Sequence, residues 1–232
     1  LTIKFGADSD VTLTHVADAG LTLSVPATAD NSFPKFNLSA GDNDIAADDV
    51  LGQIDFQAPA EGAGTDAILV GATIKAVSEG DFSSSNNASK LSFSTGKSAA
   101  AGTDGGLLEM SSTGKLTLKD LATADGSSAT ITLQSGDTDI AADDVLGKIA
   151  FQAPDEGAGT DAITVAASIQ AVSEGDFSAS NNATSVVIFT GESEAAESDG
   201  GGKYTFDSFG QLFLKNTTNA DGSTPALRFE TG

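Results

Sequence analysis

The chain has no cysteine and no tryptophan, and among its 232 residues it has one tyrosine, one methionine and one histidine. Without cysteine, neither disulfides nor cysteine-ligated zinc or iron–sulfur sites can stabilise the fold. With His15 as the only histidine, we predict neither a catalytic triad nor a histidine-rich metal site within one chain. His15 is either an ordinary surface or strand residue, or it meets its copies around a metal or anion on a trimer axis.

Basic residues are also scarce, because 11 Lys and Arg face 33 Asp and Glu and give a net charge of −22. Such an acidic chain repels phosphate backbones and anionic lipids, so we expect no nucleic-acid or membrane partner. No run approaches the ~18 apolar residues of a spanning helix, and the first residues lack a signal-peptide pattern. The acidity is consistent with solubility in a salty medium or with binding of divalent cations.

One stretch occurs twice, as residues 41–96 and 136–191, with about 40 of the 56 aligned positions identical. Both copies contain DIAADDVLG, the glycine-rich EGAGTDA, AVSEGDFS and SNNA. A repeat of this length indicates a modular protein, so the repeat has to be understood before any catalytic site is sought. EGAGTDA lacks the Lys-Ser/Thr of a phosphate-binding loop, and its acidity repels phosphate.

Alternation of apolar residues predicts the strands of each copy. The longest alternation runs from Ile68 to Ala76, and a shorter one, Ile54 to Ala58, stops at Pro59. The closing strands are KLSFSTG and SVVIFTG, of which the second is continuously apolar and is expected to bury both faces. The segments NDIAADDVLG and TDIAADDVLG are predicted to form at most two helical turns, capped by Asp44 or Asp139 and ended by Gly52 or Gly147.

The flanks of the copies repeat as well. A G-x-L-x-L strand closes HVADAGLTL, MSSTGKLTL and FDSFGQLFL, and after each linker a further strand is predicted, in FNLSAGD, ITLQSGD and LRFETG. We expect an all-β fold of tandem repeats of short, mostly antiparallel strands with tight turns, cut from a longer array. The predicted parts are the end of a preceding repeat (1–25), two modules (26–121 and 122–217) and the start of a third repeat (218–232).

The run D-V-L-G-x-I-x-F-Q-A-P, with the alternating strand and the closing T-G, resembles repeats in the shafts of tailed-phage tail fibres. The match lies in residues 49–59 with 72–96 and in residues 144–154 with 167–191, and the opening FGADSDVTLTHVADAGLTL is similar to marine phage structural repeats. The resemblance implies an interwoven parallel homotrimer in the virion, joined to other fibre proteins. It also implies a host receptor bound by a distal tip that these residues do not contain.

The residues expected to carry this function are apolar ones that pack between strands and between chains. They are Ile54, Phe56, Ile74 and Phe93 in the first copy and Ile149, Phe151, Ile169 and Ile188 in the second. No enzyme is predicted. Carboxylate pairs such as Glu79 with Asp81 are common, but one tyrosine and no tryptophan make a sugar-hydrolysing or sugar-binding cleft improbable.

The remaining candidate site is an acidic cluster at the start of each copy. Its members are Asp42, Asp44, Asp48 and Asp49, with Asp137, Asp139, Asp143 and Asp144 as their counterparts. Calcium takes six to eight oxygen ligands, which such a turn can supply in part, although the spacing is not that of an EF-hand. We expect no cofactor except possible calcium. The alternative to a phage fibre is therefore a calcium-stabilised bacterial adhesin, and the alternative role of the aspartates is capping or plain solvation.

Overall fold

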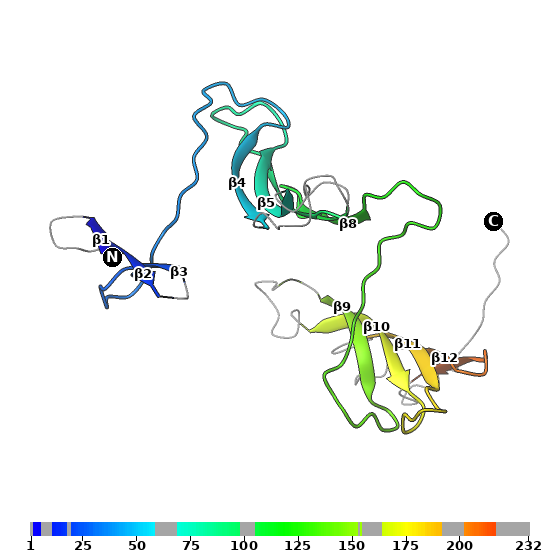
Figure 1. Ribbon diagram of the computed structural model, residues 1–232. Helices are drawn as coiled ribbons and strands as arrows, with labels where there is room; N and C mark the ends of the chain where they lie inside the picture. Colours follow the sequence, from blue (N-terminus) through cyan, green and yellow to red (C-terminus); the bar gives the residue numbers. More distant parts are fainter. Residues whose placement is uncertain are drawn as a thin grey trace. The chain divides into compact units, whose positions relative to one another are not determined.

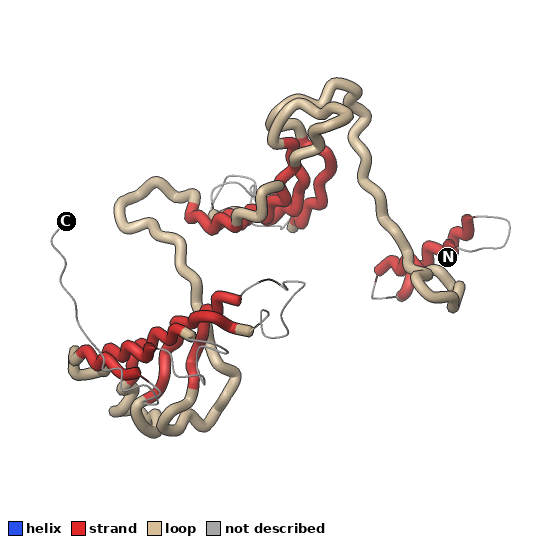
Figure 2. The backbone as a smooth tube through the Cα atoms, turned by 180° about the vertical axis from the view of Figure 1, so that it is seen from behind, coloured by secondary structure: helices blue, strands red, loops and turns tan. Residues whose placement is uncertain are grey.

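A computed structural model describes residues 2–5, 11–17, 20–58, 69–97, 105–152, 154, 164–191 and 202–216 (Figure 1). These residues form strands, turns and extended connections and contain no helix (Figure 2). None of them therefore belongs to a helix that could cross a membrane. The predicted EGAGTDA loops and the LRFETG strand lie outside the described residues.

The strands form three antiparallel sheets. The first holds β1 (Thr2–Phe5), β2 (Val11–Val16) and β3 (Gly20–Ser24). The second holds β4 (Val50–Gln57), β5 (Val70–Ser78), β6 (Ser89–Thr95), β7 (Gly106–Met110) and β8 (Leu116–Asp120). The third holds β9 (Val145–Gln152), β10 (Val165–Ser173), β11 (Thr184–Thr190), β12 (Gly202–Phe206) and β13 (Leu212–Asn216).

The two larger sheets have the same connectivity, in which each strand pairs with the next along the chain. By its internal contacts the chain divides into two compact units, Leu1–Thr130 and Ile131–Gly232, and each unit contains one of these five-stranded sheets. The prediction of an all-β protein with short antiparallel strands is confirmed.

The central strands follow the alternation of their sequence. In β5, Ala72, Ile74 and Ala76 share one face, and Thr73, Lys75 and Val77 share the other. The neighbouring strand β4 begins at Val50, four residues earlier than the alternation from Ile54 indicates. Its register with β5 shifts next to Gly52 and next to Phe56, which marks irregularities typical of strongly twisted sheets.

A strand lies at each G-x-L-x-L pattern, as predicted, and the structure shows that each is the second strand of a hairpin. Gly114 and Gly210 each adopt a φ of 78° in the turns that precede β8 and β13. In the first of these turns the N–H of Ser111 bonds to the carbonyl of Lys115, and the N–H of Gly114 bonds to the carbonyl of Ser111. Glycine is suited to this position because positive φ costs it nothing.

The predicted helical turn at DIAADDVLG is wrong. The Asp49 carboxylate accepts the backbone N–H of Ala46 at 2.7 Å, and Asp48 adopts a φ of 71°, outside the helical region. The N–H of Ser78 bonds to the carbonyl of Asp49, and the N–H of Asp48 bonds to the carbonyl of Ser78, where the β-ladder starts. The second copy repeats this geometry at Asp143, Asp144 and Ser173. An aspartate side chain that satisfies a nearby backbone N–H competes with the helix, and here it closes a turn instead.

The strands predicted in FNLSAGD and ITLQSGD are also absent from the single chain. Residues 36–42 and 131–137 are not paired in any sheet and belong to the long connections between β3 and β4 and between β8 and β9. The sequence pattern fits a strand, but no strand of the five-stranded sheets pairs with these residues.

In the closing strand of the second copy, burial is confirmed on one face only. Val187 and Phe189 are buried and pack with Val172, whereas Val186 is exposed and Ile188 is half-buried. The first copy has Ser92 and Ser94 at the positions of Val187 and Phe189, and both serines are buried. The two units therefore fill the same interior with different chemistry.

Ser78 provides a test of the turn that opens each module. Its fully buried hydroxyl accepts the N–H of Asp49 at 2.9 Å and donates to the carbonyl of Ala46. We expect Ser78→Ala to lower the free energy of unfolding by about 1–3 kcal/mol, because it leaves buried backbone groups without their partner. Denaturant unfolding measures the change. Ser84→Ala, at an exposed turn position, is the control, and equal effects of the two variants would contradict the assignment.

Candidate functional site

A row of apolar side chains crosses the sheet of the first unit from edge to edge. Strand pairing places Ile54 opposite Ile74, Ile74 opposite Phe93, Phe93 opposite Leu108, and Leu108 opposite Leu118. Opposed residues in an antiparallel sheet have their Cβ atoms within about 5.5 Å of each other on one face. The five side chains therefore form one continuous band.

A second row runs parallel to the first and lies on the same face. It is made, in cross-strand order, of Gly52, Ala76, Leu91, Met110 and Leu116. The second unit has the equivalent rows Ile149, Ile169, Ile188, Tyr204 and Leu214, and Gly147, Ala171, Val186, Phe206 and Leu212. We call the surface formed by these two rows, with Phe56 or Phe151 beside them, the apolar face of each unit.

The apolar face is open to solvent in the single chain. Ile54 is 43% exposed, Phe56 54% and Phe151 53%, and most other large side chains of the two faces exceed a third. The opposite face is the enclosed one, where Thr73, Ser92, Ser94, Ser168 and Gln170 are buried. This distribution is the reverse of that in an ordinary soluble domain, where hydrocarbon is inside and hydroxyl groups face water.

All eight residues that the sequence singled out for packing lie on the apolar faces. Six of them are exposed, and Ile74 and Ile188 are half-buried. The strand registers place Ile54 opposite Ile74 and Ile149 opposite Ile169, and the packing of the eight residues between strands and between chains stays a prediction. Among the described residues, the buried large apolar side chains are others, namely Val77, Val187 and Phe189. Val187 and Phe189 lie in the continuously apolar run Val186–Phe189, and this run was the sequence pattern that predicted their burial.

Charged side chains are kept off the two rows. In the first unit Lys75, Lys90 and Glu109 project from the enclosed face, where the Lys90 ammonium lies 3.7 Å from the Glu109 carboxylate and 3.8 Å from that of Asp48. No residue of either row in either unit carries a charge. A chain with a net charge of −22 thus presents a neutral, hydrocarbon surface on one side of each sheet.

The predicted calcium clusters are arranged as turns. Asp42 accepts the N–H of Asp44 at 3.0 Å, and Asp137 accepts that of Asp139 at 2.9 Å. Within the described residues no three His, Asp or Glu side chains converge on a point that would hold a metal ion. Four of the eight aspartates thus accept backbone N–H groups of the turns, namely Asp42, Asp49, Asp137 and Asp144. The helix-capping role expected for Asp44 and Asp139 is wrong because no helix follows them.

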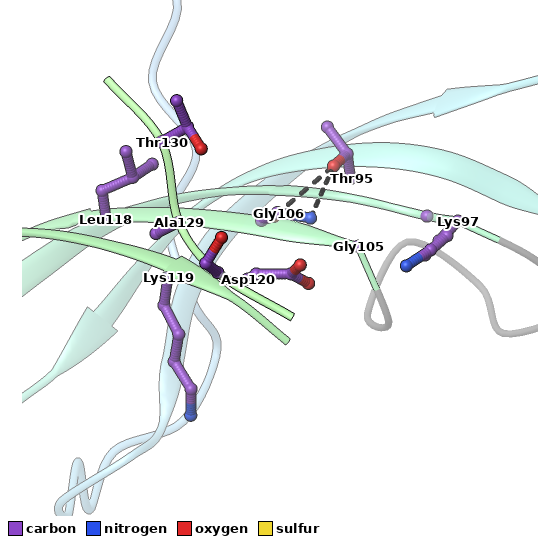
Figure 3. A pocket seen from close by; sticks show the side chains of 11 residues that line it. Thr95, Lys97, Gly105, Gly106, Leu118, Lys119, Asp120, Ala129 and Thr130 are labelled. Carbon is purple, nitrogen blue, oxygen red and sulfur yellow. Dashed lines mark hydrogen bonds between the residues drawn. The ribbon is translucent and has the colours of Figure 1, made fainter. Parts of the chain in front are cut away.

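His15 lies in β2, exposed, opposite Leu21 of β3. A hollow of about 450 Å³ lies elsewhere in the same unit, between β7, β8 and the connection that follows them (Figure 3). At its rim the N–H of Gly106 bonds to the Thr95 hydroxyl at 3.0 Å, and Lys119 extends away from that contact. A Cβ at Gly105 would come within 2.6 Å of the Thr95 carbonyl, so the backbone passes there only as glycine.

A carboxylate links the loop after the central strand to the following hairpin in both units. Glu79 accepts the N–H of Ser112 at 2.9 Å, and Glu174 accepts the N–H of Ser208 at 2.9 Å and also the Ser208 hydroxyl. Hydrogen bonds from the Ser112 side chain and backbone, with a smaller contribution from Lys90, hold the pKa of Glu79 below its ordinary value of 4.5. The contact fixes the hairpin that carries Leu108 and Leu118 relative to the central strands.

The pH dependence of this contact follows from the lowered pKa. The ionised Glu79 is favoured in the folded state, so the contact is present above pH 4.5 and is lost as the pH falls through the lowered pKa. We expect the Ser112 amide resonance to titrate with a midpoint below 4.5 and Glu79→Gln to abolish this titration. A midpoint at or above 4.5 would show that the carboxylate does not accept these bonds.

No protein-family model matches the chain, and no curated protein matches it. Among solved structures, it is similar to the carboxy-terminal domain of the bacteriophage T5 L-shaped tail fibre, with 14% identity and a TM-score of 0.37 over 91% of this chain and 97% of that one. The same domain with its intramolecular chaperone domain gives 15% identity and a TM-score of 0.37 over 91% and 67% of the two chains. The fold described above rests on the registers of its own strands.

Proposed function

We propose that the chain is a structural segment of a phage virion fibre, a part of a tail-fibre shaft in which three parallel copies assemble through their apolar faces. The resemblance of residues 49–59 and 72–96, and of their second copy, to tail-fibre shaft repeats supports this role. Its function is architectural: the shaft holds a receptor-binding tip toward the host. We assign it no catalytic role.

The observation that carries the proposal is the open apolar face of each unit. A large exposed patch of hydrocarbon on a soluble chain is typical of an interaction surface, and its free energy is recovered only when a partner covers it. Burying a large aliphatic or aromatic side chain contributes roughly 1.5–3 kcal/mol, and each unit offers more than six such side chains. The single chain, with three buried apolar residues among those described, has a small core by comparison.

Two features favour another copy of the chain as the partner. The apolar face recurs with the 95-residue repeat, so a parallel copy in the same register presents a matching face at each unit. The charges of this acidic chain lie away from the face, so copies can approach there with the least mutual repulsion. A basic partner would instead be drawn to the acidic surfaces, which lie elsewhere.

A substitution on the apolar face tests the assembly. We expect Ile54→Ser to destabilise the oligomer by about 2 kcal/mol per copy, because the side chain is buried only between chains. The matched control is Gln53→Ser, at the adjacent residue of β4, which is also exposed in the single chain but faces the other side. Dissociation and melting of the oligomer measure the difference.

Light scattering gives the state of the unmodified protein. The chain mass is 23.1 kDa, so a trimer has about 69 kDa, three times that value. A protein that stays at 23.1 kDa at all concentrations would overturn the proposal, as would an oligomer that Ile54→Ser and Gln53→Ser weaken equally.

A further inference from the structure

A hollow of about 340 Å³ lies on the enclosed face of the first unit, lined by residues of β5, β6 and β7. Four charged side chains contribute to it, namely Lys75, Lys90, Glu109 and Asp48. Its volume is at the lower end of the range of small-molecule sites, about 300–1,000 Å³. Because side chains alternate along a strand, the apolar face lies on the other side of this sheet. The hollow is therefore separate from the surface through which we propose that copies assemble.

The second unit fills the equivalent positions of its sheet. In the order Lys75, Lys90, Ser92, Ser94 and Glu109, the second unit has Gln170, Ser185, Val187, Phe189 and Thr205. Val187 is 2% exposed and Phe189 8%, so hydrocarbon occupies the place of the two serines. Both sheets have the same connectivity. The fold therefore does not depend on the charged and hydroxyl groups of the hollow, and another reason for them has to be sought.

Three polar side chains around the hollow are short of partners. Ser92 is 1% exposed and lines the hollow, and its hydroxyl makes no hydrogen bond within the described part of the chain. Among the same residues, Lys75 forms no ion pair. The Lys90 ammonium lies 3.7 Å from the Glu109 carboxylate and 3.8 Å from that of Asp48, beyond the 2.7–3.2 Å of an N–H···O hydrogen bond. Since buried polar groups normally have a partner, these groups indicate a molecule that binds in the hollow.

The charges of the hollow define the chemistry of that molecule. Two ammonium groups and two carboxylates line it, so a ligand without net charge leaves the site neutral. The strand registers place Lys75 and Glu109 on opposite sides of Ser92, so that a cation and an anion flank the hydroxyl. A ligand carboxylate beside Lys75 and a ligand ammonium beside Glu109 would both form charge-assisted hydrogen bonds, which are stronger than neutral ones.

The remaining walls of the hollow are aliphatic. They consist of Val50, Val77, Leu107 and Leu121. Such walls suit a hydrocarbon side chain, because burying apolar surface is favourable, whereas the hydroxyl groups of a sugar would lose their hydrogen bonds to water there. The hollow thus combines an anion-binding end, a cation-binding end and an apolar wall.

We propose that the hollow of the first unit binds a small zwitterion with an aliphatic side chain, the class to which the branched-chain α-amino acids belong. The ligand carboxylate pairs with Lys75 and accepts a hydrogen bond from the Ser92 hydroxyl. The ligand ammonium pairs with Glu109, and the hydrocarbon lies against Val77 and Leu107. This function goes beyond the architectural role, and it does not depend on the number of copies that assemble.

Titration of the full chain with L-leucine, followed through its valine and leucine methyl resonances, tests the proposal. We expect the methyl groups of Val77 and Leu107 to shift in a saturable manner, with a dissociation constant on the order of 1 mM. Val172, the counterpart of Val77 in the second unit, should not shift. Two analogues of leucine, 4-methylpentanoate without the ammonium and 3-methylbutylamine without the carboxylate, should each bind at least about 10-fold more weakly, because each lacks one charged hydrogen-bonding group.

Two variants carry a residue that the second unit already has at the same position. We expect Lys75→Gln to weaken leucine binding at least about 10-fold through loss of the cation, and Ser92→Val to weaken it by narrowing the hollow and removing the hydroxyl. Lys115→Gln removes a charge from an exposed residue outside the hollow and is the matched control, with unchanged binding expected. Thermal melting of the variants shows that each is folded.

Three results would overturn the proposal. The first is the lack of a saturable shift at Val77 and Leu107 with leucine up to about 50 mM. The second is binding of 4-methylpentanoate or 3-methylbutylamine as tight as that of leucine, which would show that the site does not recognise a zwitterion. The third is an equal affinity of the Lys75→Gln and Lys115→Gln variants, which would place the ligand elsewhere.

Discussion

The burial of hydrocarbon is the constraint on which the rest of this protein depends. Each five-stranded sheet aligns its largest apolar side chains, from Ile54 to Leu118 or from Ile149 to Leu214, on a face that the chain itself does not cover. The enclosed face of the first unit is filled mainly by serine and threonine hydroxyls. Such an interior contributes little hydrophobic free energy, so a unit of this kind is marginal alone and would gain most of its stability by association in the proposed assembly.

The charge distribution follows from the same constraint. Association among chains that each carry −22 is opposed by repulsion that grows with every copy added. In the proposed assembly, an uncharged surface would let short-range burial act where the copies touch. The carboxylates would remain in water, where salt screens them over about 8 Å. Turn aspartates such as Asp42 and Asp49 also have a local role, because they accept the backbone N–H groups that would otherwise lack a partner.

The features of the fold predictable from sequence are those that local chemistry decides. The alternation around Ile74 and the glycine of each G-x-L-x-L hairpin predicted β5, β8 and β13, because pleat and positive φ depend on adjacent residues alone. The helical turn at Asp44–Gly52 was predicted wrongly, because the bonds that replace it cannot be read from the sequence. The Asp49 carboxylate accepts the N–H of Ala46, and the Ser78 hydroxyl accepts the N–H of Asp49 and donates to the carbonyl of Ala46. The alternation of apolar and polar residues in the strands likewise did not show which face of the sheet is enclosed. Ser92 and Ser94 are polar but buried, whereas Ile54 is apolar but exposed in the single chain.

The chemistry of the enclosed face differs more between the two units than that of the apolar face. Ser92 and Ser94 of the enclosed face are replaced by Val187 and Phe189 in the second unit, a change that alters the local interior without altering the connectivity. The apolar face keeps Ile54, Phe56 and Leu118 as Ile149, Phe151 and Leu214. It has Ile188 and Tyr204 in place of Phe93 and Leu108. An interior can repack with its neighbours, whereas a face that meets other copies in the proposed assembly would have to match all of them at once. The change from hydroxyl to hydrocarbon on the enclosed face, beside an apolar face that stays uncharged in both units, supports that proposal.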